Sequence, residues 1–148
     1  RGESDKPESD QLDQILNDVI SLVQPMCEHH KTRFTSDRLE IDQEIRDANA
    51  LRGALLNLLL NAIEAAGPGG EVSVSTGVDS GFALIEISDN GPGVPEELTE
   101  EIFHPFVTTK KEGVGLGLAL ARQAAQDCEG SLTLIQNGRT RFQLKIPL

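Results

Sequence analysis

The feature that most constrains the fold is an apolar helical pattern that stops abruptly and gives way to strand-like alternation. Apolar residues recur at helical spacing from Leu51 to Ile63, and Gly67-Pro68-Gly69-Gly70 then breaks the helix. Beyond that break, Glu71–Thr76 and Phe82–Ser88 alternate apolar and polar residues, which predicts two antiparallel strands joined across Gly77–Gly81. A helix followed directly by a hairpin favours an α+β fold.

The rest of the chain fits the same architecture. A first helix is predicted from Gln11 to about Glu28, with Pro25 limiting its regularity, and Asn49 is expected to cap the second helix. Thr32–Arg46 contains short strand-like pieces. Further expected elements are a short acidic-faced helix at Glu96–Phe103, a helix at Leu118–Asp127, and strands at Ser131–Gln136 and Arg139–Pro147 that turn at Asn137-Gly138. Clustered helices and frequent hairpins predict a two-layer α/β sandwich.

Length and composition indicate a single domain. The chain has 148 residues, 38% of them hydrophobic, which suffices for one sizeable core but is short for two domains. Arg1–Asp10 contains no large apolar side chain, so we interpret it as a solvated linker and place the domain at residues 11–148. No apolar run approaches the length of a transmembrane helix. We therefore expect a cytoplasmic domain that makes no membrane contact of its own.

Charge and cysteine usage narrow the possible partners. A formal net charge of -11 argues against nucleic acids and anionic membranes, because the electrostatic attraction on which such binding depends is missing. Any phosphate site must therefore be local. Cys27 and Cys128 lie far apart without CxxC spacing, which fits a reduced intracellular protein and offers no metal framework. A disulfide between them remains an open alternative.

Three polar side chains share one face of the second predicted helix. Asn57, Asn61 and Glu64 stand at positions i, i+4 and i+7, which lie above one another in a helix. Such a stripe is commonly an ordinary solvent-facing surface, but those surfaces usually collect charged residues, and here two amides stand among leucines. A carboxamide oxygen suits Mg²⁺ and its NH₂ can donate to phosphate. The stripe therefore indicates a face directed at a polar ligand.

A glycine-rich loop follows the second hairpin strand. It runs from Asp89 to Pro95 with the sequence Asp-Asn-Gly-Pro-Gly-Val-Pro, and its glycines permit positive φ and close approach of a flat ligand to the backbone. The Asp89 carboxylate, at the end of a strand, can accept a hydrogen bond from an exocyclic amine such as adenine N6. Taken alone, Asp-Asn-Gly-Pro is more often a plain turn between a strand and a helix.

A second glycine loop, Gly113–Leu118, places side-chain-free amides just ahead of a helix N-terminus, where the helix dipole favours phosphate. It is not a Walker loop, because no Gly-Lys-Ser/Thr follows, nor a dinucleotide fingerprint, because Thr108-Thr109-Lys110-Lys111 precedes it instead of a strand. Lys110, Lys111 and Arg122 are candidate countercharges for a triphosphate. Lys111 is equally consistent with a solvated side chain.

In their order and spacing these segments resemble the GHKL ATP-binding superfamily, and most closely the catalytic domain of sensor histidine kinases of the nitrogen-regulation type. The segments similar to the N, G1, F and G2 boxes are Asn57-Leu-Leu-Leu-Asn61-Ala-Ile-Glu-Ala65, Asp89-Asn-Gly-Pro-Gly93, Phe103-His-Pro-Phe106-Val-Thr-Thr-Lys110 and Gly113-Val-Gly-Leu-Gly117-Leu. The resemblance spans about Leu12 to Leu148. It implies the Bergerat fold: helices on one face of a mixed, mostly antiparallel sheet, with ATP between the helix layer and a short lid.

The resemblance also implies roles for individual residues. Asn61 would coordinate Mg²⁺, Asn57 would lie close to the ATP phosphates, and Asp89 would accept a hydrogen bond from adenine N6. The lid would run from about Phe106 to Gly115. The remaining positions implied to contact ATP are Glu64, Gly91, Gly93, Val94, Thr108, Thr109, Lys110, Gly113, Val114, Gly115, Leu116, Gly117 and Leu118.

Two departures from the family pattern bear on these roles. Many histidine kinases carry a basic residue where Glu64 stands, so one phosphate contact is missing or supplied by Lys110. The His-Gly-Gly often found after the last helix is replaced by Cys128-Glu129-Gly130, which we interpret as structural.

One position distinguishes a kinase from an ATPase. Relatives that hydrolyse ATP carry a glutamate four residues before the metal-binding asparagine, where it can activate water. Asn57 occupies that position here. An amide cannot act as a general base at neutral pH, so we expect slow hydrolysis and transfer of the γ-phosphoryl group to another acceptor.

The resemblance places that acceptor, a histidine, on an upstream dimerisation domain. His29-His30-Lys31 and His104-Pro105 do not fit the family's H box, in which Arg and Pro closely follow His-Asp/Glu, so we expect the acceptor outside this chain. The parent kinase would be a homodimer that serves a response regulator, whereas the isolated domain would be a monomer that transfers poorly. Two alternatives stay open: a serine kinase of the anti-sigma-factor type, and a module that only binds ATP.

Overall fold

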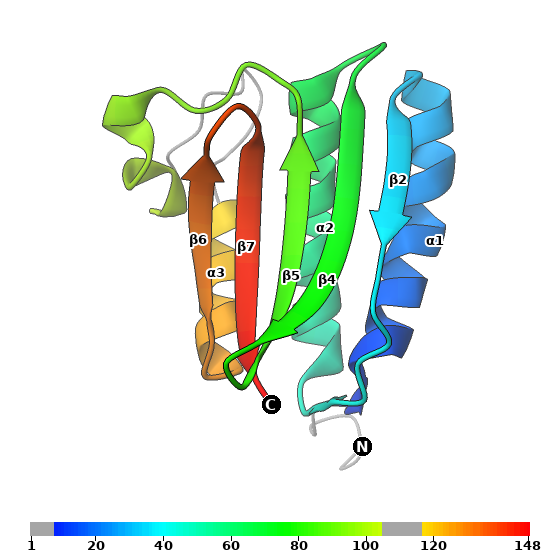
Figure 1. Cartoon of the computed structure of the whole chain (residues 1–148), viewed down its shortest axis with the longest axis vertical. Coiled ribbons are helices and arrows are strands. Elements are labelled where there is room, and N and C mark those ends of the chain that lie inside the picture. The colour runs from blue at the N-terminus through cyan, green and yellow to red at the C-terminus, as the bar shows by residue number, and fades with distance from the viewer. Residues whose placement is uncertain (1–7, 105–116) are drawn as a thin grey trace, which may run out of the picture.

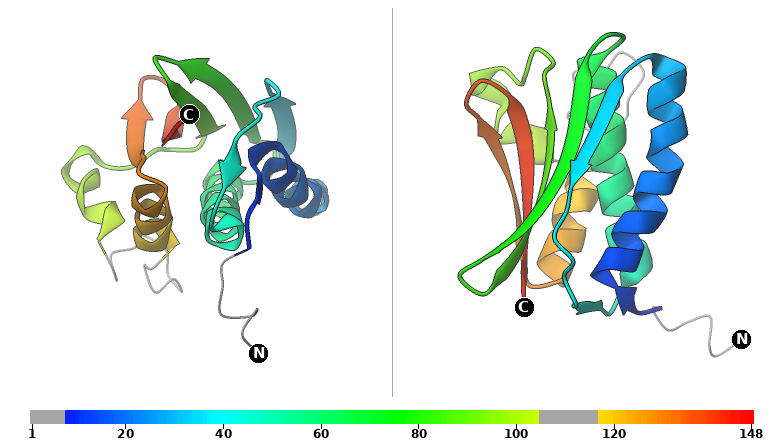
Figure 2. Two further views of the ribbon diagram at one scale, coloured as in Figure 1. Left: turned by 90° about the horizontal axis from the view of Figure 1, so that it is seen from below. Right: turned by 45° about the vertical axis from the view of Figure 1, so that its right-hand side comes forward.

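The computed structural model describes residues 8–104 and 117–148, which form two layers (Figure 1). A five-stranded sheet has the order β2-β4-β5-β7-β6, and α1, α2 and α3 lie side by side on one of its faces (Figure 2). The bounds are β1 Asp10–Gln11, α1 Leu12–His30, β2 Arg33–Asp37, β3 Glu44–Ile45, α2 Ala48–Ala66, β4 Glu71–Asp79, β5 Phe82–Asp89, α3 Gly117–Asp127, β6 Ser131–Gln136 and β7 Thr140–Pro147. The predicted α+β two-layer sandwich is confirmed.

The sheet is mixed but mostly antiparallel, as expected. Strand β2 pairs with β4 in parallel, whereas the β4–β5, β5–β7 and β6–β7 pairs are antiparallel. A separate two-stranded sheet joins β1 to β3. The β6–β7 turn has Gly138 at φ 90°, the left-handed conformation that the predicted Asn-Gly hairpin requires.

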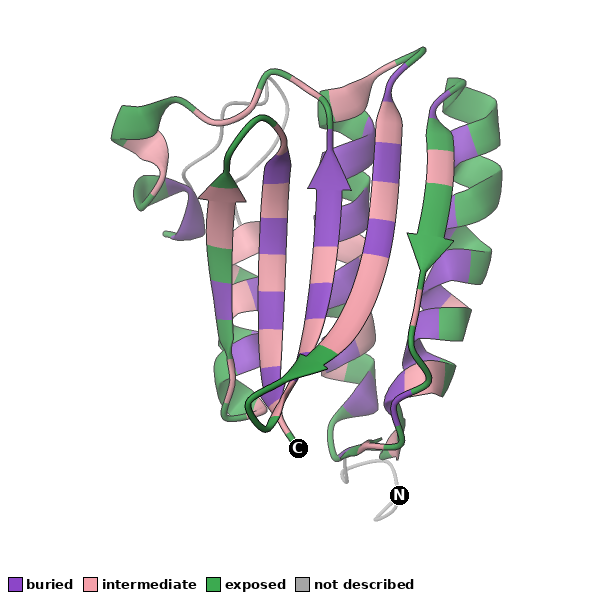
Figure 3. Cartoon of the chain, viewed as in Figure 1, coloured by how far each residue is buried: buried purple, intermediate pink, exposed green. Residues whose placement is uncertain are grey.

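The core lies between the sheet and the helix layer. Strands β4, β5 and β7 alternate between buried and partly exposed residues, and their buried side chains face the helices (Figure 3). From the helix side, α1 contributes a buried stripe from Leu12 to Cys27 and α2 one from Ala48 to Ile63. This arrangement leaves the opposite face of the sheet without a helix in the described ranges (Figure 2).

The N-cap of helix α2 lies two residues earlier than predicted. The Asp47 side chain accepts a hydrogen bond from the Ala50 N–H at 3.2 Å and so caps the helix, whereas Asn49 lies inside the first turn. The expected Asn49 cap is therefore wrong, and Asp47 does the same chemistry because both residue types can accept from an N3 amide. The helix ends where expected, at Gly67 with φ 69°.

Other boundaries differ from the predictions for local reasons. Helix α1 continues through Pro25 to His30, because Pro25 is exposed and water can solvate the carbonyl that loses its N–H partner. Strand β4 runs through Gly77, so the hairpin turns at Ser80-Gly81, where both residues have positive φ. The predicted acidic helix is two 3₁₀ turns, Glu96–Leu98 and Glu101–Phe103.

The first described residues are attached to the domain. The Glu8 carbonyl accepts from the Ala48 N–H at 2.9 Å, and Arg52 contacts the carboxylates of Asp10 at 2.6 Å and Asp18 at 2.9 Å. The domain boundary at residue 10 stays a prediction, but Glu8 and Asp10 are fixed to the start of α2. Among residues 8–104 and 117–148, no helix combines the length and apolar content needed to cross a bilayer.

Candidate functional site

Three polar residues form a row across one end of the sheet. Asp89 ends β5 and pairs with Thr140, the first residue of β7, while Thr140 pairs with Gln136, the last residue of β6. Directly paired residues point to the same face of a sheet, and here that is the face covered by helices. Asp89 is 3% exposed and Thr140 is 5% exposed, whereas Gln136 is exposed. Chain topology thus places a buried acid and a buried hydroxyl together at the uppermost end of the sheet in Figure 1.

Asp89 is a buried carboxylate whose negative charge is only partly stabilised by its neighbours. Burial raises its pKa, while the hydrogen bond from the Gly91 N–H and the positive charge of Arg139 act in the opposite direction. The Gly91 N–H donates to Asp89 Oδ1 at 2.8 Å. A carboxylate has room for several donors on its two oxygens, so Asp89 retains the capacity to accept from a ligand.

The loop that follows Asp89 packs closely against α2. A Cβ atom on Gly91 would lie 2.4 Å from the Ala65 carbonyl oxygen, so only glycine allows this approach. Asn90 fixes the loop on its other side, because its Oδ1 accepts from the Glu71 N–H at 2.8 Å. The loop containing Asp89 is thereby brought to the C-terminal end of the helix that carries Asn57 and Asn61.

The far end of the loop is held by Gln136. The Val94 N–H donates to Gln136 Oε1 at 2.8 Å, and Gln136 Nε2 donates to the Val94 carbonyl oxygen at 3.0 Å. Gly93 has φ 85°, and a Cβ there would lie 2.7 Å from Gln136 Oε1 and 3.3 Å from Thr140 Oγ1. The positive φ expected of this loop therefore occurs at Gly93.

Helix α2 carries the three polar residues Asn57, Asn61 and Glu64 predicted to face the ligand. Asn57 and Asn61 are partly exposed, and Glu64 is exposed one turn further along. A Cβ on Gly117, the first residue of α3, would lie 3.6 Å from Asn57 Cγ. The N-terminus of α3 thus lies beside Asn57, and the loop at Gly91 lies beside Ala65, so α2 is the element that both neighbours share. Glu64 lies outside these two contacts.

Several predicted site residues fall outside the described ranges. These are Thr108, Thr109, Lys110, Gly113, Val114, Gly115 and Leu116, and with them Lys111 and the predicted lid. Leu118 lies in the first turn of α3, partly buried against the core. The guanidinium of Arg122 lies 5.3 Å from the centre of the Phe103 ring, a cation–π contact that the sequence did not indicate.

None of the three histidines or two cysteines belongs to the row formed by Asp89, Thr140 and Gln136. His29, His30 and His104 are exposed, and the two cysteines are free thiols. Burial raises the pKa of both the Cys27 and Cys128 thiols, which lowers their reactivity. Gly130 lies against β7, where a Cβ would meet the Lys145 carbonyl oxygen at 1.8 Å. That close approach supports the structural interpretation of Cys128-Glu129-Gly130.

Sequence reasoning missed Thr140 and Gln136. Both flank the Asn137-Gly138 turn, so hairpin pairing alone could have put them opposite each other. Their position beside Asp89 depends on β7 lying next to β5, a contact between distant segments for which the sequence contains no local signal. Thr140 and Gln136 are consequently site candidates that only the strand order reveals.

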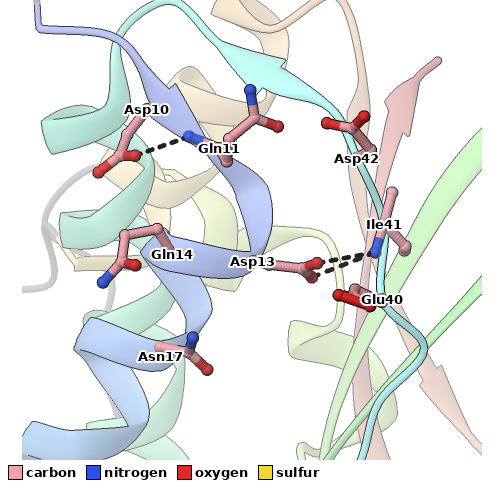
Figure 4. Close-up of a pocket in the computed structure, with 8 residues that line it drawn as sticks. All are labelled: Asp10, Gln11, Asp13, Gln14, Asn17, Glu40, Ile41 and Asp42. Carbon is pink, nitrogen blue, oxygen red and sulfur yellow. Dashed lines mark hydrogen bonds between the residues drawn. The ribbon is translucent and has the colours of Figure 1, made fainter.

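A separate hollow lies at the other end of the domain. It has a volume of about 610 Å³ and is bounded by the start of α1 and the segment leading to β3, with Asp10, Asp13, Glu40 and Asp42 among its lining residues (Figure 4). Both oxygens of Asp13 accept from the Ile41 N–H, at 3.2 and 3.0 Å, so this carboxylate closes the loop onto α1. The hollow shares no residue with the row Asp89–Thr140–Gln136. In the described ranges, no three His, Cys, Asp or Glu side chains gather as a metal-ligand set.

Residues 46–148, which include the polar row and all of α2, match a family model described as histidine kinase-, DNA gyrase B- and HSP90-like ATPase. The chain belongs to this family. Sensor histidine kinase ZraS of Escherichia coli O157:H7 is 30% identical over 95% of this chain and 36% of its own length. Sensory histidine kinase/phosphatase NtrB of Klebsiella oxytoca is 34% identical over 69% of this chain and 33% of its own length.

Solved structures of family members share the fold. The catalytic domain of histidine kinase ThkA superposes with a TM-score of 0.84 at 29% identity, covering 95% of this chain and 94% of that one. The mycobacterial sensor histidine kinase MprB gives a TM-score of 0.81 at 26% identity, with 95% and 97% covered. ThkA has also been solved in complex with the response regulator TrrA, and this chain covers 41% of the matched chain there. The chain is an ATP-binding domain of the histidine kinase catalytic type, and it spans about a third of the length of the curated relatives it matches.

Proposed function

We propose that the chain binds ATP with Mg²⁺ and transfers the γ-phosphoryl group to a histidine on an upstream dimerisation domain of a two-component sensor kinase. The observation that carries the proposal is the convergence on α2 of two segments far apart in the sequence. Asn57 adjoins the start of α3, and Gly91, two residues after Asp89, adjoins Ala65. Relatives at 28–35% identity are named sensor kinases, which supports the same activity.

Each side of this region suits one part of ATP. The buried Asp89 carboxylate is a hydrogen-bond acceptor for the adenine amine, and Thr140 lies beside it on the neighbouring strand. The N-terminus of α3 offers amides and a favourable dipole to phosphate. The base would therefore lie at the end of the sheet and the triphosphate towards the start of α3.

The donor set on α2 fits Mg²⁺ in a nucleotide complex. A neutral carboxamide oxygen is a suitable ligand, and Mg²⁺ usually completes its octahedron with phosphate oxygens and water instead of a full protein cage. Asn61 would supply that oxygen, one turn before Ala65. When bound, the metal would neutralise charge on the phosphates, which is the main requirement for phosphoryl transfer.

Asn57 favours transfer over hydrolysis. It lies beside the start of α3, four residues before Asn61, at the position where relatives that hydrolyse ATP carry a glutamate as general base, and an amide has no basic site at neutral pH. We therefore propose that the chain works as the ATP-binding half of a kinase. The acceptor domain, a homodimeric parent and delivery to a response regulator belong to the same proposal.

Substitution of Asn61 by alanine tests the metal-dependent part of the proposal. Asn61→Ala should weaken Mg²⁺-dependent ATP binding at least tenfold in calorimetry, because the carboxamide ligand is removed. Asn49→Ala, on the first turn of the same helix, is the matched control and should bind as the wild type does. Circular dichroism verifies that both variants are folded. Undiminished metal-dependent affinity in Asn61→Ala would contradict the assignment.

A further inference from the structure

Gln136 makes a two-point contact with the loop that follows Asp89. Its side-chain amide accepts from the Val94 N–H at 2.8 Å and donates to the Val94 carbonyl oxygen at 3.0 Å. A carboxamide that pairs with both polar groups of one residue fixes the position and the orientation of that backbone, which a single hydrogen bond does not. This contact joins residues 42 positions apart in the chain.

The opposite end of the loop is fixed independently. Asp89 accepts from the Gly91 N–H at 2.8 Å, and Asn90 accepts from the Glu71 N–H at 2.8 Å. Between these contacts and Val94, the loop passes through Gly93 at φ 85°, against Gln136 Oε1 and Thr140 Oγ1. Gln136 is thus the attachment that determines where the second half of the loop lies.

The contact is connected to Asp89 through Thr140. Thr140 is the cross-strand neighbour of both Asp89 and Gln136, and its hydroxyl donates to Gln136 Oε1 at 3.5 Å. The oxygen that holds the Val94 N–H therefore also faces the buried hydroxyl next to Asp89. A shift of Gln136 would alter the loop and the polar row together.

We propose that Gln136 is a positioning residue for the base of the bound nucleotide: it holds the loop Asn90–Pro95 on the β6–β7 hairpin, so that the pocket beside Asp89 is shaped before ATP arrives. The inference rests on the proposed function in one respect, that the base lies beside Asp89. A preformed loop avoids the entropic cost of ordering on binding, so its loss weakens recognition of the base more than recognition of the phosphates.

The first test follows the loop without nucleotide. In Gln136→Ala, hydrogen exchange at the Val94 amide should become about tenfold faster, because the Val94 N–H loses its acceptor, while exchange at Gly91, held by Asp89, stays unchanged. Gln143→Ala is the matched control, since Gln143 hydrogen bonds Glu86 at 2.9 Å from the other face of β7. Unchanged exchange at Val94 would overturn the inference.

The second test measures base selectivity on the same variants. Inosine triphosphate carries an oxygen in place of the adenine amine, so the ratio of its dissociation constant to that of ATP reports the base contact alone. Gln136→Ala should lower this ratio about three- to tenfold, whereas Gln143→Ala should leave it at the wild-type value. General destabilisation would weaken both nucleotides equally, and an unchanged ratio would overturn the positioning role. Absence of any preference for ATP in the wild-type chain would instead contradict the proposed base contact.

Discussion

The Asp89 carboxylate lies 3% exposed at the end of β5, in a chain whose formal net charge is already -11. Burial raises its pKa, because the ionised form loses hydration that the Gly91 N–H and Arg139 replace only in part. At neutral pH the ionised side chain therefore costs folding free energy. Buried carboxylates with perturbed pKa values cluster at functional sites, which fits the base-binding role proposed for Asp89.

Replacement of Asp89 by asparagine should separate stability from binding. Asp89→Asn keeps an oxygen for the Gly91 N–H and removes the buried charge, so the unfolding free energy should rise by about 1 kcal/mol at pH 7. A raised pKa means that the cost is absent below the pKa of the unfolded chain, grows as pH rises from that value to the folded value, and stays constant above it. Urea unfolding should thus show a gap between variant and wild type that widens with pH and then levels off.

Binding should move in the opposite direction. The asparagine amide presents a donor as well as an acceptor to the adenine amine, so ATP affinity should fall about tenfold at pH 7. Asp79→Asn is the control, because Asp79 also ends a strand but is exposed, and neither property should change there. A variant less stable than the wild type across the whole pH range would contradict the account of Asp89.

The elements were predictable where the signal is local. The apolar stripe of α2, its stop at Gly67 and the Asn137-Gly138 turn are each encoded within a few residues, and the structure has them where expected. Helix α2 also keeps Asn57 and Asn61 on its polar side because their spacing is fixed by helix geometry. Two neighbouring residues that can both cap a helix were harder to distinguish, because the cap of α2 is Asp47 and not the expected Asn49.

Contacts between elements were not predictable from such patterns. The pairing of β7 with β5 brings Thr140 and Gln136 to Asp89, and it depends on strand order, which no local segment encodes. The acidic segment before His104 formed two 3₁₀ turns because its buried residues, Ile102 and Phe103, are too few to support a helix of several turns. The type of each element was therefore easier to predict from the sequence than the residues that surround the site.

Two glycines test the packing between elements. Gly130→Ala would place a Cβ 1.8 Å from the Lys145 carbonyl oxygen. Because that oxygen belongs to the backbone and cannot move aside as a flexible side chain could, the unfolding free energy should fall by about 3 kcal/mol. Gly53→Ala, at an exposed position of α2 with nothing within 4 Å of the added Cβ, should instead raise it by about 0.5–1 kcal/mol. Denaturant unfolding of both variants measures these two changes in unfolding free energy. A tolerated Gly130→Ala would show that the close approach of Gly130 to β7 is wrong.

At the scale of the whole molecule, α2 acts as the common framework. It packs against α1, α3, β4 and β5, and it carries Asn57 and Asn61. The start of the described chain is tied to the same helix through Arg52, which contacts Asp10 at 2.6 Å. If an upstream segment joins the domain at that point, its attachment and Asn61, the proposed Mg²⁺ ligand, would lie on the same helix.

Whether the domain is a kinase or an ATPase depends on the group that receives the γ-phosphoryl of ATP. If ATP binds beside Asn57 as proposed, no general base would act on water there, so the γ-phosphoryl group would need an acceptor from elsewhere. None of the three histidines belongs to the polar row and none fits the H box of the family, so we expect the acceptor elsewhere. In the proposed reaction, this domain would hold ATP and a second domain would hold the accepting histidine.

The most direct test of that division is transfer from γ-labelled ATP to the full-length parent protein, followed by identification of the labelled residue. We expect acid-labile phosphohistidine outside residues 1–148, and no stable label on the isolated chain. Acid-labile label on His29, His30 or His104, acid-stable phosphoserine, or release of inorganic phosphate without labelled protein would contradict it.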